Sequence, residues 1–354
     1  MNKFCEKVNK LLPYIGFIVV CFFFGTSYAI STLGYKVYDN VLFISMRMIF
    51  AFIALLITFI IYLSFSKKYR AFIKESFRSG DTCWWKAMIL GLLQYGFPHS
   101  MIALGQRSVS STIVTIVQPL VPGAALLFAS IFLPDERFTW PKLIPHVIAI
   151  IGCSLTCIPP FLQTDTKGQT TNWYDMLMVF IAVFSFGFGS VFYKMFLVRS
   201  DFLAVCVLQL LGSSIYALVF SIIRRGWKEN FDAWFHPKKE IFWPFLIGVG
   251  YTATSACICV WICRKLGAVK SQLVNFGQIA IGVITGVVFM HDFRGYEPWM
   301  QAVSYVGVIL LIISMVIGFY VDHTKEVIVN NNVGIDPLIS DTQDSKDNSP
   351  KVNT

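Results

Sequence analysis

Long apolar runs alternate with short polar segments along nearly the whole chain. A membrane-spanning helix needs about 20 predominantly apolar residues, and ten runs approach or reach this length. The alternating polar and apolar positions of barrel strands are missing, so we expect an all-α integral membrane protein. The ten expected spans are Pro13–Leu33, Val41–Phe65, Ala87–Gly105, Ser110–Leu133, Leu143–Leu162, Tyr174–Tyr193, Phe202–Ile223, Ile241–Cys263, Ser271–Met290 and Pro298–Val321.

The first five runs resemble the second five at nearly constant offsets of 155 to 162 residues. The matched residues are Phe22–Gly25 with Phe184–Gly187, Arg47 with Gln209, Gly91 with Gly248, Glu136 with Asp292, and Gly152 with Gly307. We therefore expect a repeat at 13–162, a linker at 163–173 and a second repeat at 174–321. Five is an odd number, so the two repeats would enter the membrane in opposite directions. Inverted-topology repeats of this kind are typical of transporters.

Composition supports the membrane class. Hydrophobic residues make up 56% of the 354 residues and charged residues 14%, and the mean hydropathy is +0.64. A soluble domain carries about 25% charged residues, and a disordered chain has low hydrophobicity and high charge. The composition therefore excludes both classes. The polar tail at 322–354 is the exception, and we expect it to be disordered.

The net charge of +9 comes from basic residues that flank the apolar runs. This placement favours a membrane protein with positive cytoplasmic loops over a nucleic-acid-binding protein. With residues 1–12 in the cytoplasm, ten spans put both termini there. More Lys and Arg residues then lie on the cytoplasmic side than on the other side, which holds nine. Five of those nine lie in Arg224–Glu240, which this topology does not explain.

The sequence contains no motif of a cofactor or metal site. Most of the nine cysteines lie in apolar runs without zinc-ligand spacing, and no phosphate-binding or zinc-protease motif occurs. We therefore expect no cofactor, no metal and no enzymatic activity. The GxxxG run Gly282–Gly286 indicates close helix packing, preferably within one protomer. Monomer and homodimer both stay open.

The chain resembles the drug/metabolite transporter superfamily, in particular its EamA-like members with two five-helix repeats. The resemblance covers about residues 13–320. The stretches that carry it are Ala103–Gly105, Gln118–Leu120, Asp135–Phe138 and the run around Gly152. It implies ten helices in two inverted repeats and a central cavity. The second half departs from the family pattern, because Asn275 stands where a proline is usual and Asp292 where a glutamate is usual.

Arg47 is the sharpest candidate for a functional side chain. It lies about six residues inside the second run, and charged residues inside a membrane are costly and often functional. Its guanidinium could bind an anionic substrate group. Alternatively, it extends to the interface or bonds the carbonyls of a neighbouring helix. Gln209 would be its neutral counterpart in the second repeat.

Other polar residues fall inside the third, fourth, eighth and ninth runs, and Tyr28 lies in the first. Tyr95 and His99 share a helix face, and His99 could bind substrate, accept a proton or be a structural histidine. Gln118 precedes Pro119, which bends a helix and frees a carbonyl. We expect a substrate cavity among these four runs. Its candidate residues are Arg47, His99, Gln118, Gln94, Tyr251, Asn275, Gln278, Gln209 and Tyr28.

Every acidic residue lies at the end of a run, in a loop or in the tail. This argues against proton or sodium coupling through a carboxylate. We expect a secondary transporter that moves a small polar metabolite by alternating access, with the lipid bilayer as its environment. The alternative is a nucleotide-sugar or organophosphate exchanger of the same superfamily. A non-transporting receptor and an intramembrane enzyme fit less well, because neither needs an inverted repeat.

Overall fold

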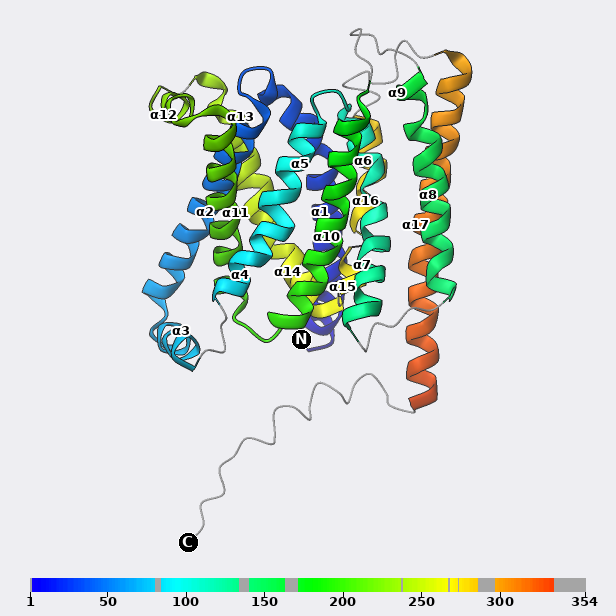
Figure 1. Cartoon of the computed structure of the whole chain (residues 1–354). Coiled ribbons are helices and arrows are strands. Elements are labelled where there is room, and N and C mark those ends of the chain that lie inside the picture. The colour runs from blue at the N-terminus through cyan, green and yellow to red at the C-terminus, as the bar shows by residue number, and fades with distance from the viewer. Residues whose placement is uncertain are drawn as a thin grey trace.

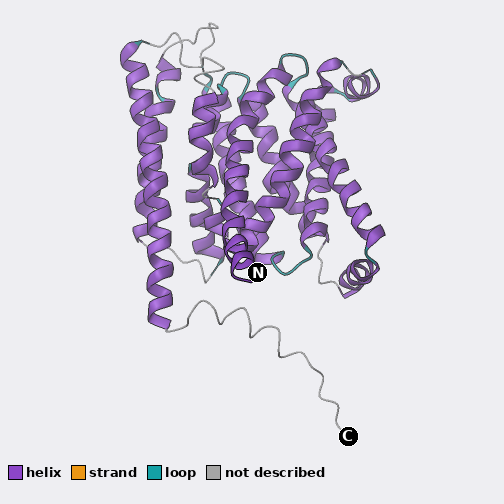
Figure 2. Ribbon diagram, turned by 180° about the vertical axis from the view of Figure 1, so that it is seen from behind, coloured by secondary structure: helices purple, strands orange, loops and turns teal. Residues whose placement is uncertain are grey.

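The chain forms a bundle of helices that run mostly along one direction (Figure 1). The computed structural model describes residues 2–79, 84–133, 140–162, 171–236, 238–266, 268–272, 274–285 and 297–333. Within these ranges every regular element is helical, and Figure 2 shows the same arrangement from behind. The all-α fold predicted from the apolar runs is confirmed.

The first half contributes the following helices. They are α1 (Asn2–Tyr35), α2 (Asn40–Phe65), α3 (Lys67–Ser79), α4 (Trp84–Gly91), the π-helical turn η1 (Leu92–Gly96), α5 (Phe97–Gly105), α6 (Ser111–Val117), α7 (Leu120–Phe132), α8 (Trp140–Cys157) and α9 (Pro159–Leu162).

The second half contributes a similar series. It comprises α10 (Trp173–Phe196), α11 (Phe202–Arg225), α12 (Trp227–Phe235), the 3₁₀ turn η3 (Lys239–Ile241), α13 (Phe242–Phe245), the π-helix η4 (Leu246–Ala253), α14 (Thr254–Leu266), α15 (Ala268–Ser271), α16 (Val274–Ile284) and α17 (Pro298–Val333).

Eight helical stretches in the described residues are long and apolar enough to cross a membrane. Two of the ten expected spans are not among them. Leu143–Leu162 corresponds to a shorter apolar helix, Leu143–Cys157. Ser271–Met290 corresponds to α15 and α16 and then runs into residues 286–296, which lie outside the described residues. The chain is thus a multi-pass membrane protein, and the count of ten stays a prediction.

The two ends of the chain differ from the expected boundaries. The first helix begins at Asn2 rather than at Pro13, and α17 continues to Val333 instead of ending at Val321. Asp322–Val333 contains neither Gly nor Pro, so nothing in its sequence stops the helix. The expected disordered tail is therefore helical up to Val333, and residues 334–354 lie outside the described part.

Local chemistry sets several helix starts. The Asp39 carboxylate accepts a hydrogen bond from the Val41 backbone N–H at 3.0 Å, and the Asp201 carboxylate accepts one from Ala204 at 2.8 Å. These bonds satisfy backbone donors that the first turn of a helix leaves free. Pro298 starts α17, where its missing N–H costs nothing. Asp201 is thus the capping residue of α11.

Glycines let the backbones of the two halves approach closely, at positions matched by the predicted repeat. A Cβ on Gly25 of α1 would lie 2.8 Å from the Gln278 carbonyl oxygen of α16. A Cβ on Gly187 of α10, the match of Gly25, would lie 2.7 Å from the Ala124 Cβ of α7. Each glycine thus packs its helix against the broken span of the other half.

Gly91 and Gly248, the second matched pair, also let helices of the two halves approach closely. A Cβ on Gly248 would lie 2.6 Å from the Arg47 carbonyl oxygen, and one on Gly91 would overlap the Gln209 carbonyl oxygen. The sequence alone matches Gly91 with Gly248 at one offset and Arg47 with Gln209 at another. The two helix crossings are therefore equivalent under the predicted repeat.

The two residues of the third matched pair, Gly152 and Gly307, contact each other where α8 and α17 cross. A Cβ on Gly152 would lie 2.8 Å from the Gly307 carbonyl oxygen, and one on Gly307 would lie 2.6 Å from the Gly152 carbonyl oxygen. Figure 1 shows α1 and α10 starting at opposite ends of the bundle, as an inversion requires. These contacts support the predicted repeat. The matched acidic residues Glu136 and Asp292 lie outside the described residues.

We predict that Gly91→Ala destabilises the protein by about 1–3 kcal/mol, because the new methyl group meets backbone rather than a flexible side chain. Gly250→Ala is the matched control, since its Cβ would have only an ordinary contact at 3.9 Å with Leu246. Thermal unfolding of both variants in detergent, followed by size-exclusion chromatography, measures the difference. Equal melting temperatures for the two variants would contradict the close α4–α11 contact.

Candidate functional site

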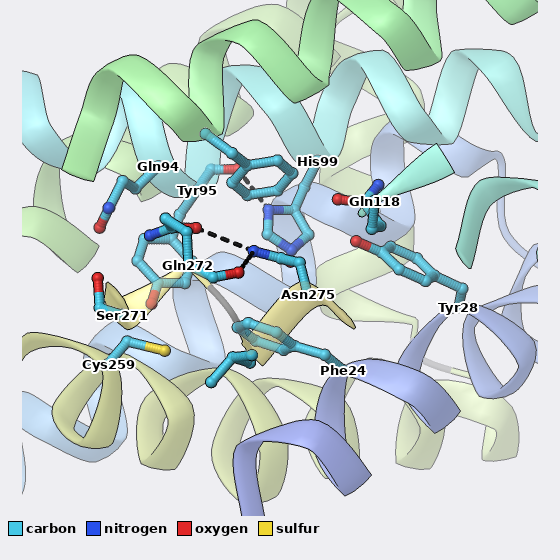
Figure 3. A pocket seen from close by; sticks show the side chains of 12 residues that line it. Phe24, Tyr28, Gln94, Tyr95, His99, Gln118, Cys259, Ser271, Gln272 and Asn275 are labelled. Carbon is cyan, nitrogen blue, oxygen red and sulfur yellow. Dashed lines mark hydrogen bonds between the residues drawn. The ribbon is translucent and has the colours of Figure 1, made fainter. Parts of the chain in front are cut away.

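A cavity of about 40 Å³ lies inside the bundle, between helices of both halves (Figure 3). Its walls are aromatic rings and neutral polar groups. None of its lining side chains in the described part of the chain carries a carboxylate, an ammonium or a guanidinium group. The lining residues are Phe24, Tyr28, Gln94, Tyr95, His99, Gln118, Phe186, Cys259, Ser271, Gln272, Val274 and Asn275.

A break in the fourth span brings Gln118 to the cavity. Helix α6 ends at Val117, and α7 begins at Leu120 after a turn at Gln118–Pro119. Pro119 has no N–H to continue the helical pattern. The Gln118 side chain is buried, and its Nε2 group has no hydrogen-bond partner among the described residues. The interruption predicted at Pro119 is confirmed, and it leaves an amide donor free at the cavity.

The ninth span is broken at the corresponding place without a proline. Helix α15 ends at Ser271, and α16 begins at Val274. The Asn275 side-chain amide donates to the Gln272 carbonyl oxygen at 2.9 Å and to the Gln272 side-chain oxygen at 3.0 Å (Figure 3). These bonds satisfy polar groups that the break exposes. Ser271, Gln272 and Asn275 all line the cavity from this break.

The third span contributes Gln94 and Tyr95 from the π-helical turn η1 and His99 from α5. In this turn the Phe97 N–H bonds to the Leu92 carbonyl, five residues back. The next residue, Pro98, has no N–H for the Leu93 carbonyl. Ser185 of α10 supplies the missing donor, since its hydroxyl donates to the Leu93 carbonyl oxygen at 2.6 Å. Pro98 thus accounts for the free carbonyl, and α10 satisfies it.

His99 is oriented by its own helix. Its Nδ1 lies 2.9 Å from the Tyr95 carbonyl oxygen, which can only accept, so Nδ1 carries the hydrogen. The other ring nitrogen, Nε2, is then the acceptor of the neutral imidazole. The ring stacks on Tyr95 at 5.8 Å and meets Phe186 edge-on at 5.4 Å. The shared face predicted for Tyr95 and His99 is confirmed.

Arg47 lies behind the cavity wall rather than in it. Its side chain is only 3% exposed, so it does not extend to the membrane surface. Its Nε donates to the Thr252 hydroxyl at 2.7 Å, and no ion pair joins it to a described Asp or Glu. The cavity residues Tyr28, Tyr95 and His99 lie within electrostatic reach of its charge. The cavity is therefore uncharged but borders a buried cation.

The π-helix η4 places Thr252 against Arg47. The Thr252 hydroxyl donates to the Ile247 carbonyl oxygen, five residues back, at 3.0 Å, and it accepts the bond from Arg47. The two π-helical segments, η1 and η4, overlap when the repeats are aligned at the offset of Gly91 and Gly248. Both repeats therefore interrupt the α-helical pattern at equivalent points, one beside the cavity and one beside Arg47.

Five of the nine candidate residues line the cavity, and four do not. The five are Tyr28, Gln94, His99, Gln118 and Asn275. Gln278 is buried behind Asn275 and donates to its side-chain oxygen at 3.3 Å. Tyr251 packs on Phe23, with the ring centroids 4.7 Å apart. Gln209 is fully buried on α11, and neither atom of its side-chain amide has a hydrogen-bond partner in the described part of the chain.

Seven of the lining residues are not among the nine candidates from the sequence, and one of them, Tyr95, lies on the predicted face of His99. Phe24 and Phe186 come from the first and sixth spans, beyond the four runs that were expected to enclose the cavity. Ser271 and Gln272 flank a helix break that no proline marks. The offset between the repeats could have found this break, because it places Asn275 on Pro119.

Comparison with known proteins finds a family model that matches part of the chain. Residues 11–158 match the model of the EamA-like transporter family. The match ends close to the expected end of the first repeat, and it confirms the resemblance predicted from the sequence. Among curated proteins, none matches the chain.

Twenty-four chains of solved structures match the fold. One, titled "Crystal structure of protein", has a TM-score of 0.56 and 15% sequence identity, and the match covers 88% of this chain and 98% of that one. At this identity the likeness shows the fold alone. The EamA-like match supports a membrane transporter of the drug/metabolite type. Members of this family are transporters, which fits the expectation that the chain is not an enzyme.

We predict that Ser185→Ala destabilises the protein by about 1–3 kcal/mol, because it leaves the buried Leu93 carbonyl without a donor. Adding Pro98→Ala restores an N–H that can reach this carbonyl, so the double variant should recover part of the loss. Ser190→Ala is the control, since the Ser190 hydroxyl bonds only within α10, to Gly187. Thermal unfolding in detergent distinguishes the variants. No recovery in the double variant would contradict the role assigned to Pro98.

Proposed function

We propose that the protein is a secondary transporter that moves a small polar metabolite by alternating access, and that the cavity is its substrate site. The observation that carries the proposal is the position of the cavity at helix breaks in both halves. Transporters with inverted repeats bind substrate where discontinuous helices meet, because the broken ends offer polar groups inside the membrane. Gln118 and Asn275 stand at two such breaks.

The chemistry of the cavity favours a solute with polar edges and a flat or apolar body. Gln118 offers an unpartnered amide donor, and the neutral His99 ring offers an acceptor. Phe24, Tyr28, Tyr95 and Phe186 supply ring faces and edges. Such groups fix the orientation of a ligand while apolar walls supply contact area.

Arg47 favours an anionic group on that solute. A buried guanidinium without a carboxylate is costly, and here a single hydroxyl partners it among the described residues. A substrate anion that approaches from the Tyr28 and His99 side would reduce this cost. Nucleotide-sugar or organophosphate exchange is the alternative from the same superfamily. It would require more cationic groups at the cavity than Arg47 alone.

Transport would require movement of the two halves. The cavity volume of about 40 Å³ holds roughly three water molecules, so a metabolite fits only after the helices separate. Substrate shifts the balance of inward-open and outward-open states by its differential affinity for them. No carboxylate in the described part of the chain lines the cavity. This leaves facilitated diffusion, solute exchange or proton coupling through His99 as the proposed modes.

The test is solute uptake into proteoliposomes that contain the purified protein. The screen covers amino acids, nucleosides, nucleotide sugars, sugar phosphates and amphipathic cations, each with and without a proton gradient. We expect saturable uptake of one class, with an anionic or zwitterionic solute preferred over a cation. Absence of uptake for every class, with protein that is correctly folded by thermal unfolding, would overturn the proposal.

Arg47→Gln should lower the uptake of the preferred anion by about tenfold to a hundredfold, the range for loss of a charged hydrogen bond. Melting temperature separates this role from a structural one. Removing an uncompensated buried charge should leave stability unchanged or raise it, whereas loss of a structural residue lowers it. Arg107→Gln, at an exposed turn residue, is the matched control. A lower melting temperature with unchanged uptake would assign Arg47 to the fold.

Gln118→Leu should raise the KM for the transported solute severalfold and leave the melting temperature unchanged or higher. The variant removes a free donor at the cavity without breaking a side-chain hydrogen bond that the described residues form. Gln209→Leu is the control, because it also removes an unpartnered buried amide but lies away from the cavity. Equal KM values for both variants would contradict a substrate contact at Gln118.

A further inference from the structure

Helix α12 lies across the bundle direction at one end of the molecule, where it is seen nearly end-on (Figures 1 and 2). It directly follows α11 and forms the start of the basic segment Arg224–Glu240. It is not one of the helices that are long enough to span the membrane, and none of its residues lines the cavity. Its side chains divide into three sectors around the helix axis.

One sector holds α12 on the bundle. Ala233 and Trp234 are half-buried against the main core, and Asn230 is buried between α11 and α12. The Asn230 side-chain amide donates to the Gly226 carbonyl oxygen at 2.9 Å, and its oxygen accepts from the Ser221 hydroxyl at 2.7 Å. Gly226 turns the chain with a φ of 84°, which favours glycine. These bonds fix the orientation of α12 relative to α11.

The second sector is an exposed aromatic stripe. Trp227, Phe231 and Phe235 are 66%, 45% and 66% exposed. They are spaced four residues apart, so they lie within about 80° of one another around the helix. Phe231 and Phe235 stack with ring centroids 4.2 Å apart. The stripe is a rigid apolar face without a protein partner in the described part of the chain.

The stripe continues a lipid-facing surface. Helix α11 exposes Ile215, Val219 and Ile223 along one side, again four residues apart. Because α11 spans the membrane, this apolar side must face lipid. Ile223 belongs to the last turn of α11, and Trp227 follows it four residues later as the first residue of α12. The apolar face of α11 therefore leads directly to the aromatic stripe.

The third sector is charged. Lys228 and Asp232 lie next to the stripe on the side away from the core, and Lys238 and Lys239 follow shortly after α12. Arg225 is held by ion pairs with Asp39 at 3.5 Å and Glu229 at 3.2 Å. The exposed lysines beside aromatic rings match the charge of anionic lipid headgroups.

We propose that α12 is an interfacial helix and that its exposed face contacts the bilayer surface. Its aromatic stripe enters the boundary between headgroups and acyl chains, and its lysines contact anionic headgroups. An apolar stripe, a charged sector beside it and a position in the membrane plane match the features of such helices. The proposal rests on the membrane fold and is independent of the transported solute.

This assignment explains the basic segment that the topology left unexplained. Loop charge predicts topology when the basic residues are free to determine which side a loop stays on. Here Arg225 is neutralised by two carboxylates, and the nearby lysines are placed at headgroup level by a helix bound to α11. The five basic residues of Arg224–Glu240 then indicate a helix at the membrane surface and do not place this segment in the cytoplasm.

Helix α3 occupies the matching place after α2 at the opposite end of the bundle (Figure 1). It is also attached to its neighbours, because the Tyr69 hydroxyl donates to the Asp201 carboxylate at 2.6 Å. Burial, together with this bond, raises the pKa of Tyr69, so the hydroxyl stays protonated and donating. Helix α3 directs Tyr69 and Ile73 inward, and it exposes four basic side chains, Lys67, Lys68, Arg70 and Lys74. Among its described side chains Phe72 is the one aromatic that is exposed, at 54%. The stripe of three exposed aromatic residues is therefore a feature of α12.

The experiment measures the depth of single side chains in proteoliposomes of neutral and anionic phospholipid. Phe231→p-acetylphenylalanine and, separately, Asp232→p-acetylphenylalanine introduce a ketone for a nitroxide label without touching the native cysteines. Both positions are exposed, so the label should not disturb packing. Power-saturation electron paramagnetic resonance compares collisions with oxygen, which concentrates in lipid, and with a nickel chelate, which stays in water.

We expect the oxygen-to-nickel collision ratio to be several-fold higher at position 231 than at position 232. Replacing Lys228, Lys238 and Lys239 together with Gln should reduce the ratio at 231 in anionic vesicles and leave it unchanged in neutral ones. Equal, water-like ratios at the two positions would overturn the proposal. Low collision rates with both reagents at 231 would also overturn it, because they would show that protein, such as a second copy, covers the stripe.

Discussion

The fold depends on one constraint, which is that a backbone polar group inside a membrane has no water to bond with. Every interruption of a spanning helix must therefore be satisfied by another part of the protein. The Ser185 hydroxyl donates a hydrogen bond to the Leu93 carbonyl that Pro98 leaves free, and the Thr252 hydroxyl donates one to the Ile247 carbonyl. The Asn275 amide donates one to the Gln272 carbonyl at the break before α16. These interruptions lie inside the bundle, and two of the three border the cavity. The polar character of the cavity is thus a by-product of broken helices.

The sequence predicted most of the fold because the signals were long and redundant. Ten apolar runs and their repeated order were enough to give the all-helical membrane class, and Pro119 marked the break beside Gln118. The site was harder to predict because it depends on short deviations from the regular helix. In a regular helix Gln94 lies well away from the face of His99, yet the π-helical turn brings both to the cavity. No proline marks the helix break at Gln272, so the sequence did not predict that Ser271 and Gln272 line the cavity.

Burial also separates candidates that the sequence could not separate. Arg47, Gln209 and Gln278 are all polar residues inside spans, and all three are buried. Arg47 is joined to Thr252 and acts on the cavity through its charge, whereas Gln278 supports Asn275 through a hydrogen bond. The Gln209 backbone packs on Gly91, and no described residue forms a hydrogen bond with its side-chain amide. Matching positions in the two halves thus share backbone contacts while their side chains have diverged.

If the two halves move relative to each other as proposed, the crossing of α8 and α17 has a mechanical consequence. Residues matched by a twofold relation touch each other only near the axis of that relation, and Gly152 and Gly307 do so. When two bodies rock about an axis, points on the axis hardly move, and displacement grows with distance from it. The glycine crossing would then act as a fulcrum. Small backbone-to-backbone contacts suit such a point, because no long side chain has to change rotamer as the angle changes. The parts of the bundle that lie farthest from the Gly152–Gly307 contact would then undergo the largest displacements.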